Sequence, residues 1–283
     1  MSAEKNLLTV KDLVVEYPGK GMFAKPFRVL HGVSVDIAEG ETVGLVGESG
    51  SGKTTIGRAV LGLAPVTEGT ITLEGNDISH ATRKERQKLS RDLQVVFQDP
   101  YTSLNPSMTV GDILSEPLGI QGITGPDARK RVKELLDRVH LPVDAMDRLP
   151  REFSGGQRQR VAIARALALR PKLIVCDEPV SALDLSTQAR VLDLFLEIQQ
   201  LTGVSYLFIS YDLDVVRHVS HRVAVLYKGE IVEQGEALQV TGDPVHPYTR
   251  RLLLASPVPD PDRQAERRKA RLAHKAATAG EAA

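Results

Sequence analysis

The stretch GESGSGKTT, from Gly47 to Thr55, constrains this chain more than any other. It fits the pattern G-x-x-x-x-G-K-[ST], and it follows a short apolar run, TVGLVG at 42–47, that reads as a strand. A helix is expected to begin near Gly52. In such a strand, loop and helix, glycines let consecutive backbone N–H groups converge on phosphate oxygens, and the helix N-terminus adds partial positive charge. The sequence therefore predicts a phosphate-binding loop.

Two residues of this P-loop have a predicted chemical role. Lys53 is expected to reach the β and γ phosphates of ATP, and the hydroxyl of Thr54 to ligate Mg²⁺. The alternative is an ordinary glycine-rich turn, against which the flanking strand and helix argue. The residues expected to contact ATP in the loop are Gly47, Glu48, Ser49, Gly50, Ser51, Gly52, Lys53, Thr54 and Thr55.

The composition is that of a soluble globular protein. Of 283 residues, 42% are hydrophobic and 25% are charged, and 36 Lys plus Arg balance 36 Asp plus Glu. No overall field favours nucleic acid, which is not an expected partner. The single cysteine, Cys176, excludes an internal disulfide and a multi-thiolate zinc site. Because neither a signal peptide nor an apolar run of about 18 residues is recognisable, we expect the chain to stay in the cytosol.

Strand and helix patterns alternate along most of the chain. The ranges 7–17 and 28–37 read as exposed antiparallel strands, because apolar and polar residues alternate in them. Further elements are expected as strands at 172–178 and 205–210, helices at about 185–201 and 212–219, and a hairpin at 222–235. Strands separated by helices predict an α/β fold with a largely parallel sheet and helices on both faces.

A small helical insertion is expected to begin near 98 and to end by about 150–155. Its clearest helix is 128–141, where Val132, Leu135, Leu136 and Val139 fall on one face. The range 98–155 is therefore predicted to form a helical subdomain.

A second candidate for the site is LIVCDEP, residues 173–179. A buried strand should not end in two adjacent carboxylates unless a cation or a proton-accepting role offsets their desolvation. We expect Asp177 to hold Mg²⁺ and Glu178 to act as general base on the attacking water. Alone, such a run is often a strand end at a surface, but downstream of a P-loop it predicts the other half of one site.

The sequence EFSGGQ, residues 152–157, offers another anion-binding helix start. A serine hydroxyl and two glycine amides precede a helix whose Ile163, Ala164 and Leu167 share a face that can pack on the sheet. A chain with two phosphate-binding helix starts and one P-loop suggests a dimer. In it, Ser154, Gly155, Gly156 and Gln157 of each chain would close the partner's site.

These motifs, in this order, resemble the ATP-binding cassette family over residues 7–240. The resemblance implies a P-loop NTPase fold with a RecA-like core, an antiparallel β subdomain and the helical subdomain. It also implies that Gln98 contacts Mg²⁺ and couples to a membrane domain, and that Asp184 of the D-loop crosses the dimer interface. An aromatic residue would stack on adenine, with Tyr17 as the first candidate and Phe27 as the alternative.

Within the family, the chain looks like an ATPase subunit of an oligopeptide or dipeptide importer, a group that also serves nickel and glutathione. The segment His246–Thr249, HPYT, is the most characteristic feature, and the range 241–283 is expected to be an extension with a basic tail. The resemblance implies a second ATPase subunit, two transmembrane permeases and, indirectly, an extracytoplasmic solute-binding protein. It places the chain peripherally on the cytoplasmic face of the inner membrane. No cysteine follows Cys176, so no iron–sulfur cluster is expected.

One position departs from the family. Where SHD is expected, the chain has Ser210, Tyr211 and Asp212, so Tyr211 replaces the switch histidine. A histidine can donate, accept and become cationic near neutral pH, whereas a tyrosine has one O–H donor and stays neutral. His218 and His221 lie too far along the next helix to substitute. We expect this chain's own site to bind ATP and Mg²⁺ but to hydrolyse slowly.

Four alternatives to an importer ATPase with one slow site stay open. Tyr211 can be tolerated because Glu178 carries the chemistry, or it can be an introduced substitution. The chain can also be a mainly regulatory ATP-binding subunit. A soluble cassette protein of DNA repair or translation is the fourth, although the second cassette, long coiled coil or zinc cysteines typical of that class are absent from this sequence.

Overall fold

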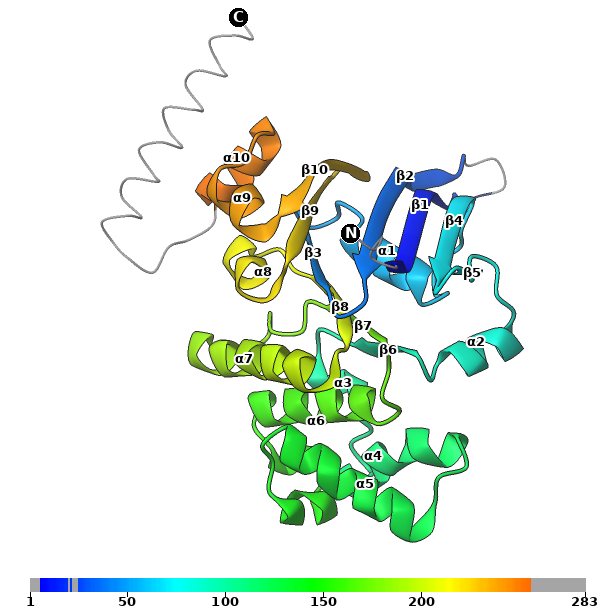
Figure 1. Cartoon of the computed structure of the whole chain (residues 1–283), viewed down its shortest axis with the longest axis vertical. Helices are drawn as coiled ribbons and strands as arrows, with labels where there is room; N and C mark the ends of the chain where they lie inside the picture. The colour runs from blue at the N-terminus through cyan, green and yellow to red at the C-terminus, as the bar shows by residue number, and fades with distance from the viewer. Residues whose placement is uncertain (1–5, 20, 22–24, 256–283) are drawn as a thin grey trace, which may run out of the picture.

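The computed structural model describes residues 6–19, 21 and 25–255, whose arrangement is shown in Figure 1. Two sheets form the framework. The larger contains β3 (Thr42–Val46), β6 (Leu93–Val96), β7 (Leu173–Asp177), β8 (Ser205–Ile209), β9 (Arg222–Tyr227) and β10 (Glu230–Glu236). The smaller contains β1 (Asn6–Tyr17), β2 (Phe27–Ala38), β4 (Glu68–Leu73) and β5 (Asn76–Asp77).

The larger sheet has the strand order β10-β9-β3-β8-β7-β6 and is parallel except for β10, an antiparallel edge strand. Its central strands are continuous apolar runs, as expected when both faces are covered. Alternate residues pack into different cores: Val175 and Ile209 face one side, and Cys176 and Phe208 face the other. The predicted α/β class is confirmed.

Ten α-helices are described, and some of them cover the two faces of this sheet. They are α1 (Lys53–Val60), α2 (Arg83–Leu89), α3 (Pro100–Ser103), α4 (Val110–Ile120), α5 (Gly125–Arg138), α6 (Gly155–Leu167), α7 (Leu185–Thr202), α8 (Leu213–Val219), α9 (Ala237–Gly242) and α10 (Pro247–Ala255). Two short 3₁₀ turns, η1 (Val143–Asp147) and η2 (Pro150–Glu152), precede α6. The predicted strands and helices after 172 fall within a few residues of the observed ones.

The smaller sheet is antiparallel, with β1 between β2 and β4. We expected its first two strands to be exposed, which is wrong: Leu8, Val10 and Leu13 are buried. They pack with α1 and the near face of the larger sheet in one hydrophobic cluster. The alternating pattern marks one buried face, not an exposed strand.

The helical region between β6 and β7 shares one hydrophobic cluster with the far face of β7 and β8. Val132, Leu135, Leu136 and Val139 are all buried, as the periodicity predicts. Helix α6 lies between this helical region and the sheet, and its Ile163 is buried in the same cluster. Helices α3, α4 and α5 lie within 98–155. The boundaries of the helical subdomain stay a prediction.

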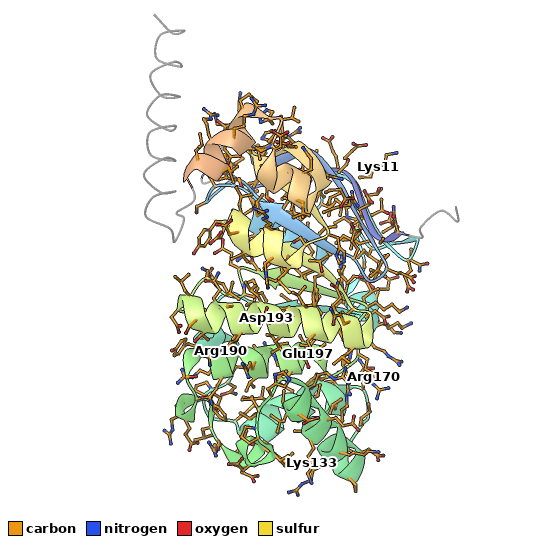
Figure 2. All side chains as sticks on the ribbon, turned by 60° about the vertical axis from the view of Figure 1, so that its left-hand side comes forward. Lys11, Lys133, Arg170, Arg190, Asp193 and Glu197 are labelled. Carbon is orange, nitrogen blue, oxygen red and sulfur yellow. The ribbon has the colours of Figure 1, made fainter. Side chains whose placement is uncertain are left out.

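Helix α7 lies between the sheet side and the helices α4 to α6 (Figure 2). Asp193 and Glu197 are one turn apart on it. The Nε2 atom of His218, on α8, lies 3.0 Å from Asp193 Oδ1, and Nε2 of His140 lies 3.3 Å from Glu197 Oε1. The two carboxylates therefore tie α7 to elements on either side of it.

The C-terminal part of the described chain packs on the edge of the larger sheet (Figure 1). Helices α8, α9 and α10 form a third hydrophobic cluster with β9 and the end of β3, in which Tyr248 is the largest buried residue. The predicted basic tail lies outside the described residues. In the part of the chain that the structure describes, no helix is long and apolar enough to span a membrane.

Candidate functional site

The P-loop connects β3 to α1, as predicted. Gly47 ends the strand region with φ 154°, and a Cβ placed there would lie 2.1 Å from the carbonyl oxygen of Leu226. Gly52, the N-cap of α1, has φ 109°, and a Cβ there would lie 2.7 Å from Leu30 Cδ2. Both positions therefore require glycine, for close approach and for left-handed backbone.

Lys53 lies folded back into its own loop. Its Nζ donates hydrogen bonds to the carbonyl oxygens of Gly47 at 2.8 Å and Glu48 at 2.9 Å, and the residue is buried. Burial lowers the Lys53 pKa, while the nearby carboxylates of Glu178 and Asp177 oppose that change. The ammonium is thus pre-positioned in the loop and faces two acids.

Asp177 closes the site from the end of β7. The Thr54 hydroxyl donates a 2.9 Å hydrogen bond to its Oδ1. Burial raises the Asp177 pKa, and the Thr54 bond, Arg58 and Lys53 oppose that change. The structure thus brings together two of the three residues predicted to contact Mg²⁺.

Glu178 follows directly with a left-handed backbone, φ 50°, which is unusual for a residue with a side chain. Its N–H donates to the carbonyl of Ile209 at 2.9 Å, which fixes this conformation against β8. Burial raises the Glu178 pKa, Lys53 lowers it, and Asp177 raises it further. A carboxylate with a raised pKa near the lysine that is predicted to bind phosphate is suited to general base catalysis.

The remaining predicted residues of this chain's own site follow strands of the same sheet. Val96 pairs with Cys176, and Ile209 pairs with both Leu45 and Asp177, so the carboxyl ends of β6, β7, β8 and β3 meet at one edge. Gln98 lies two residues after β6 with an exposed side chain. The topology therefore places Gln98, the acids, Tyr211 and the P-loop at a common edge, where α/β proteins bind ligands.

Tyr211 is 51% exposed. Among the described residues, its hydroxyl has no hydrogen-bond partner. The neighbouring backbone is fixed, because Ser210 is buried and its hydroxyl accepts from the N–H of Asp212 at 3.0 Å, and Asp212 in turn caps α8. The phenol ring thus projects from a rigid turn at the site's edge.

Neither nearby histidine replaces a switch residue. His218 bonds to Asp193 on α7. His221 Nδ1 accepts from the N–H of Thr42, at the opposite end of β3 from the P-loop. This agrees with the distance argument from the sequence.

The SGGQ segment forms the start of α6. The N–H of Ser154 donates to Gln157 Oε1 at 3.0 Å, and the Ser154 hydroxyl accepts from the Gln157 N–H at 3.4 Å, a capping box. No hydrogen bond within 6–19, 21 and 25–255 joins residues 154–157 to this chain's own P-loop. That residues 154–157 close the ATP site of a partner chain stays a prediction.

The D-loop residue Asp184 has a clear local role. Its carboxylate accepts from the N–H of Thr187 at 3.0 Å and from the Ser186 hydroxyl at 2.7 Å, which caps α7. These hydrogen bonds lower the Asp184 pKa well below its usual range. Its place in a dimer interface stays a prediction.

The two candidates for adenine stacking are cross-strand partners. Tyr17 on β1 pairs with Phe27 on β2. Tyr17 is partly buried against the core, whereas Phe27 is 68% exposed. A Cβ at Gly52 would touch Leu30, so this end of β2 adjoins the P-loop and either ring stays a candidate.

Sequence reasoning missed one contact of the loop. The backbone N–H of Glu48 donates a 3.0 Å hydrogen bond to the hydroxyl of Tyr248, 200 residues later. Tyr248 belongs to the HPYT segment, which the sequence analysis singles out as characteristic. That segment was the signal from which a contact with the loop could have been sought.

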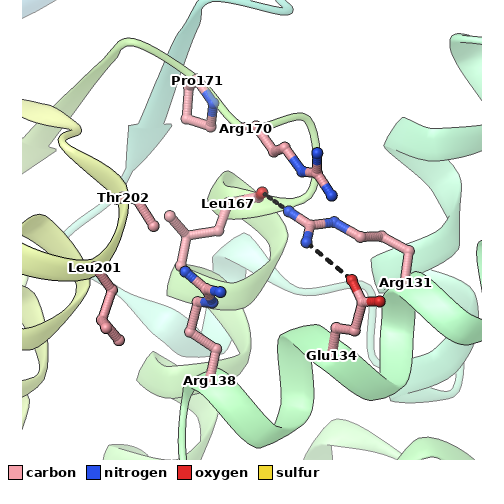
Figure 3. A pocket seen from close by; sticks show the side chains of 8 residues that line it. All are labelled: Arg131, Glu134, Arg138, Leu167, Arg170, Pro171, Leu201 and Thr202. Atoms are coloured by element: carbon pink, nitrogen blue, oxygen red, sulfur yellow. Dashed lines mark hydrogen bonds and ion pairs between the residues drawn. The ribbon is translucent and has the colours of Figure 1, made fainter.

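The structure also has a basic pocket of about 300 Å³ between α5 and the ends of α6 and α7 (Figure 3). Its polar lining includes Arg138, Arg170 and Arg131, whose guanidinium donates to Leu167 O at 3.0 Å and to Glu134 at 3.3 Å. No lining residue comes from the P-loop or from the strand ends at the site edge. This pocket is separate from the nucleotide site.

Comparisons with known proteins agree with this geometry. Residues 30–181 match the family model described as ABC transporter. The chain is 50% identical over 265 residues to a putative peptide import ATP-binding protein of Brucella ovis, covering 93% of this chain and 83% of that one. It is 48% identical over 271 residues to the oligopeptide transport ATP-binding protein OppF of Lactococcus lactis, covering 94% and 85%. The ATP-binding cassette MJ0796, solved as a post-hydrolysis dimer bound to ADP and Pi, superposes with a TM-score of 0.73 at 31% identity, covering 81% of this chain and 98% of that one.

Proposed function

The chain belongs to the ABC transporter family and is an ATPase of that type, and on this premise we propose that it powers the import of peptides or related small solutes. The relatives named for peptide and oligopeptide import match it at about half identity over more than nine-tenths of its length. Nickel and glutathione are the related solutes that the sequence resemblance leaves open.

The observation that carries the proposal is the cluster at the strand ends. Lys53 lies buried in the loop beside two acids, and the Thr54 hydroxyl bonds to Asp177. In the proposed reaction, the P-loop amides and Lys53 bind the phosphates. Glu178 accepts a proton from the water that attacks the γ-phosphate.

The residues present fit a magnesium ion. Thr54 Oγ1 and Asp177 Oδ1 lie 2.9 Å apart, and adjacent ligands of an octahedral Mg²⁺ are about 3 Å apart. Both are oxygen ligands, and Mg²⁺ commonly takes one or two protein groups with phosphates and water. Gln98 would be a further contact. When bound, the ion neutralises charge on the β and γ phosphates.

We infer that the active unit is a dimer, in which Ser154 to Gln157 and Asp184 serve the partner's ATP. The partner is proposed to be a different ATPase subunit, and both would dock on two permeases at the cytoplasmic face of the membrane. An extracytoplasmic binding protein would supply the solute. Support comes from the free helix start of α6 and from the dimeric cassette to which the chain is similar.

We further propose that the site built on this chain's Lys53 hydrolyses slowly. Tyr211 projects largely into solvent where the family places a histidine near the γ-phosphate. The same observation favours the second candidate function, a mainly regulatory subunit whose own site binds ATP without appreciable turnover. In both cases the partner's P-loop would carry a competent site.

The experiment is to copurify the chain with its neighbouring subunits and to reconstitute the complex in vesicles. ATP hydrolysis and uptake of labelled peptide are expected to require each other, and Lys53→Ala in this chain is expected to reduce both. Glutathione and nickel uptake, measured in parallel, separate the candidate solutes. A complex that hydrolyses ATP with no response to any of these solutes would contradict the import proposal.

A further inference from the structure

The hydroxyl of Tyr248 is the point where the C-terminal segment reaches the nucleotide loop. It accepts a 3.0 Å hydrogen bond from the Glu48 N–H, and Tyr248 itself is 2% exposed. A buried tyrosine usually places its hydroxyl against a polar partner. Here that partner is a backbone amide of the P-loop.

The peptide groups around Glu48 connect this hydroxyl to Lys53. The Glu48 N–H is held by Tyr248, and the Glu48 carbonyl accepts from Lys53 Nζ at 2.9 Å. A shift of the loop at Glu48 therefore moves a group that holds the phosphate-binding lysine. On the other side of the loop, the N–H of Gly229 donates to Ser51 O at 3.0 Å, which gives a second tether.

The tyrosine ring is held firmly. It packs on Tyr227 with ring centroids 4.1 Å apart, within the cluster that also contains Val46, the last residue of β3. Ring and loop are thus supported by the same core. The hydroxyl has little freedom to follow a displaced loop.

The chain leading to Tyr248 is clamped to the sheet. The carboxylate of Glu233, on β10, accepts from the N–H of Val245 at 2.7 Å and from the N–H of His246 at 3.0 Å. The His246 ring then accepts from the Tyr248 N–H at 3.2 Å, at the start of α10. A continuous set of bonds therefore runs from β10 through the HPYT segment to the P-loop.

We propose that Tyr248 is a positioning residue for nucleotide binding, through which the segment 243–255 holds the P-loop in its phosphate-binding form. The inference rests on the proposed ATP site. Its consequence is that the HPYT segment sets ATP affinity from outside the loop, although no side chain of the segment needs to touch ATP.

The test is Tyr248→Phe in the full chain, because phenylalanine keeps the ring packing and removes only the hydroxyl. ATP affinity, measured with Mg²⁺ by calorimetry, is expected to fall about threefold to tenfold, the range of one ordinary hydrogen bond. In the assembled complex with the partner's catalytic glutamate removed, KM for ATP should rise in parallel while kcat stays within about twofold. Hydrogen exchange of the peptide containing Glu48 should become faster.

Two matched variants separate positioning from general stability. Tyr227→Phe removes a hydroxyl from the other ring of the same pair. Tyr206→Phe removes a buried hydroxyl that donates to Phe195 O at 3.3 Å, in a hydrophobic cluster different from that of Tyr248. Both are expected to leave ATP affinity within about twofold, even where Tyr206→Phe lowers the melting temperature.

The outcomes are distinct. ATP affinity of Tyr248→Phe within twofold of the parent, measured well below both melting temperatures, overturns the inference and leaves the ATP site intact. Equal losses in all three variants also overturn it, since they would show a stability effect. Failure of the parent chain to bind ATP would instead refute the proposed function on which the inference rests.

Discussion

Thr54 and Asp177, 123 residues apart in the chain, meet in a 2.9 Å hydrogen bond between hydroxyl and carboxylate. The bond joins the start of α1 to the end of β7, the two elements that flank the phosphate position in the proposed reaction. It orders two oxygens that are proposed as magnesium ligands, so less ordering would be needed when the ion binds.

The first prediction concerns this pair. Thr54→Val removes the hydroxyl at nearly constant volume, whereas Thr54→Ser keeps it. We expect the valine variant to lose most of the increase in ATP affinity that Mg²⁺ gives, and the serine variant to retain it. Binding curves with Mg²⁺ and with EDTA check this. Equal Mg²⁺ enhancement in both variants would exclude Thr54 as a ligand.

Glu178→Gln should separate catalysis from stability. Removal of a general base is expected to lower hydrolysis by this chain's site about 10²- to 10⁴-fold, with ATP affinity retained. Because burial disfavours the charged carboxylate, the nucleotide-free variant should melt no lower than the parent at neutral pH. Calorimetry and single-site turnover give the two readings.

The exposed Glu230→Gln is the matched control and should change neither. A Glu178→Gln protein that hydrolyses at the parent rate would remove Glu178 from the mechanism. One that melts well below the parent would show that the carboxylate stabilises the fold.

The third prediction is a pH dependence. The Glu178 pKa is raised from its ordinary value of 4.5 by burial. The base must be ionised, so kcat should fall on acidification through a pKa above 4.5. Rate measurements from pH 4.5 to 8 on the assembled complex, with the partner's catalytic glutamate removed, locate this limb, which should be missing from the residual rate of Glu178→Gln.

The same raised pKa values affect the stability of the fold in the opposite direction: kcat rises with pH, whereas the stability that these carboxyls contribute falls. A carboxyl whose pKa is higher in the folded state binds protons that the unfolded state releases. The contribution of Asp177 and Glu178 to the free energy of unfolding of the nucleotide-free chain should therefore decrease as pH rises through their raised pKa values. Within that window, Glu178→Gln should weaken the dependence.

Local patterns account for much of the agreement between sequence and structure. The P-loop is set by glycines and a short apolar strand within one stretch, so β3 and the start of α1 at Lys53 were predictable. The strands β7 and β8 are apolar runs of ordinary length. The pattern did not reveal that β1 is half buried, because burial depends on the sheet packed against it.

Contacts between distant segments could not be predicted. We assigned no elements to 68–96, where β4, β5, α2 and β6 lie, and β4 is recognised by its pairing with β1. The bond from Glu48 to Tyr248 spans 200 residues and depends on how α10 packs. The left-handed backbone of Glu178 follows from its bond to Ile209, which no local signal encodes.

A fourth prediction addresses the signature segment. A Cβ at Gly156 would lie 2.2 Å from Thr187 Cγ2, so the starts of α6 and α7 touch. Gly156→Ala should destabilise the chain by about 1 to 3 kcal/mol, the usual cost of overpacking. Adding Thr187→Ser removes the clashing methyl and should recover most of the loss.

Chemical denaturation of the single and double variants measures this coupling. Gly119→Ala, in a helix position with nothing within 4 Å of the new Cβ, should be neutral or stabilising. Additive effects of Gly156→Ala and Thr187→Ser would contradict direct contact between the two helix starts.

The last prediction is Tyr211→His. The turn that carries residue 211 is fixed by the Ser210 and Asp212 bonds, so a histidine would project from the same backbone position as the phenol. It adds a donor that can become cationic at the position proposed to face the γ-phosphate. By analogy, removing one donor of an oxyanion hole costs about 10²- to 10³-fold in rate. Turnover should be measured in the assembled transporter with the partner's catalytic glutamate removed, so that this chain's site is the one observed. We expect a large gain for Tyr211→His and none for Tyr211→Phe. The complex that lacks only the partner's catalytic glutamate is compared with the complex that has both glutamates. Equal turnover in the two would show that Glu178 carries the chemistry without a switch residue, and that both sites are used alike.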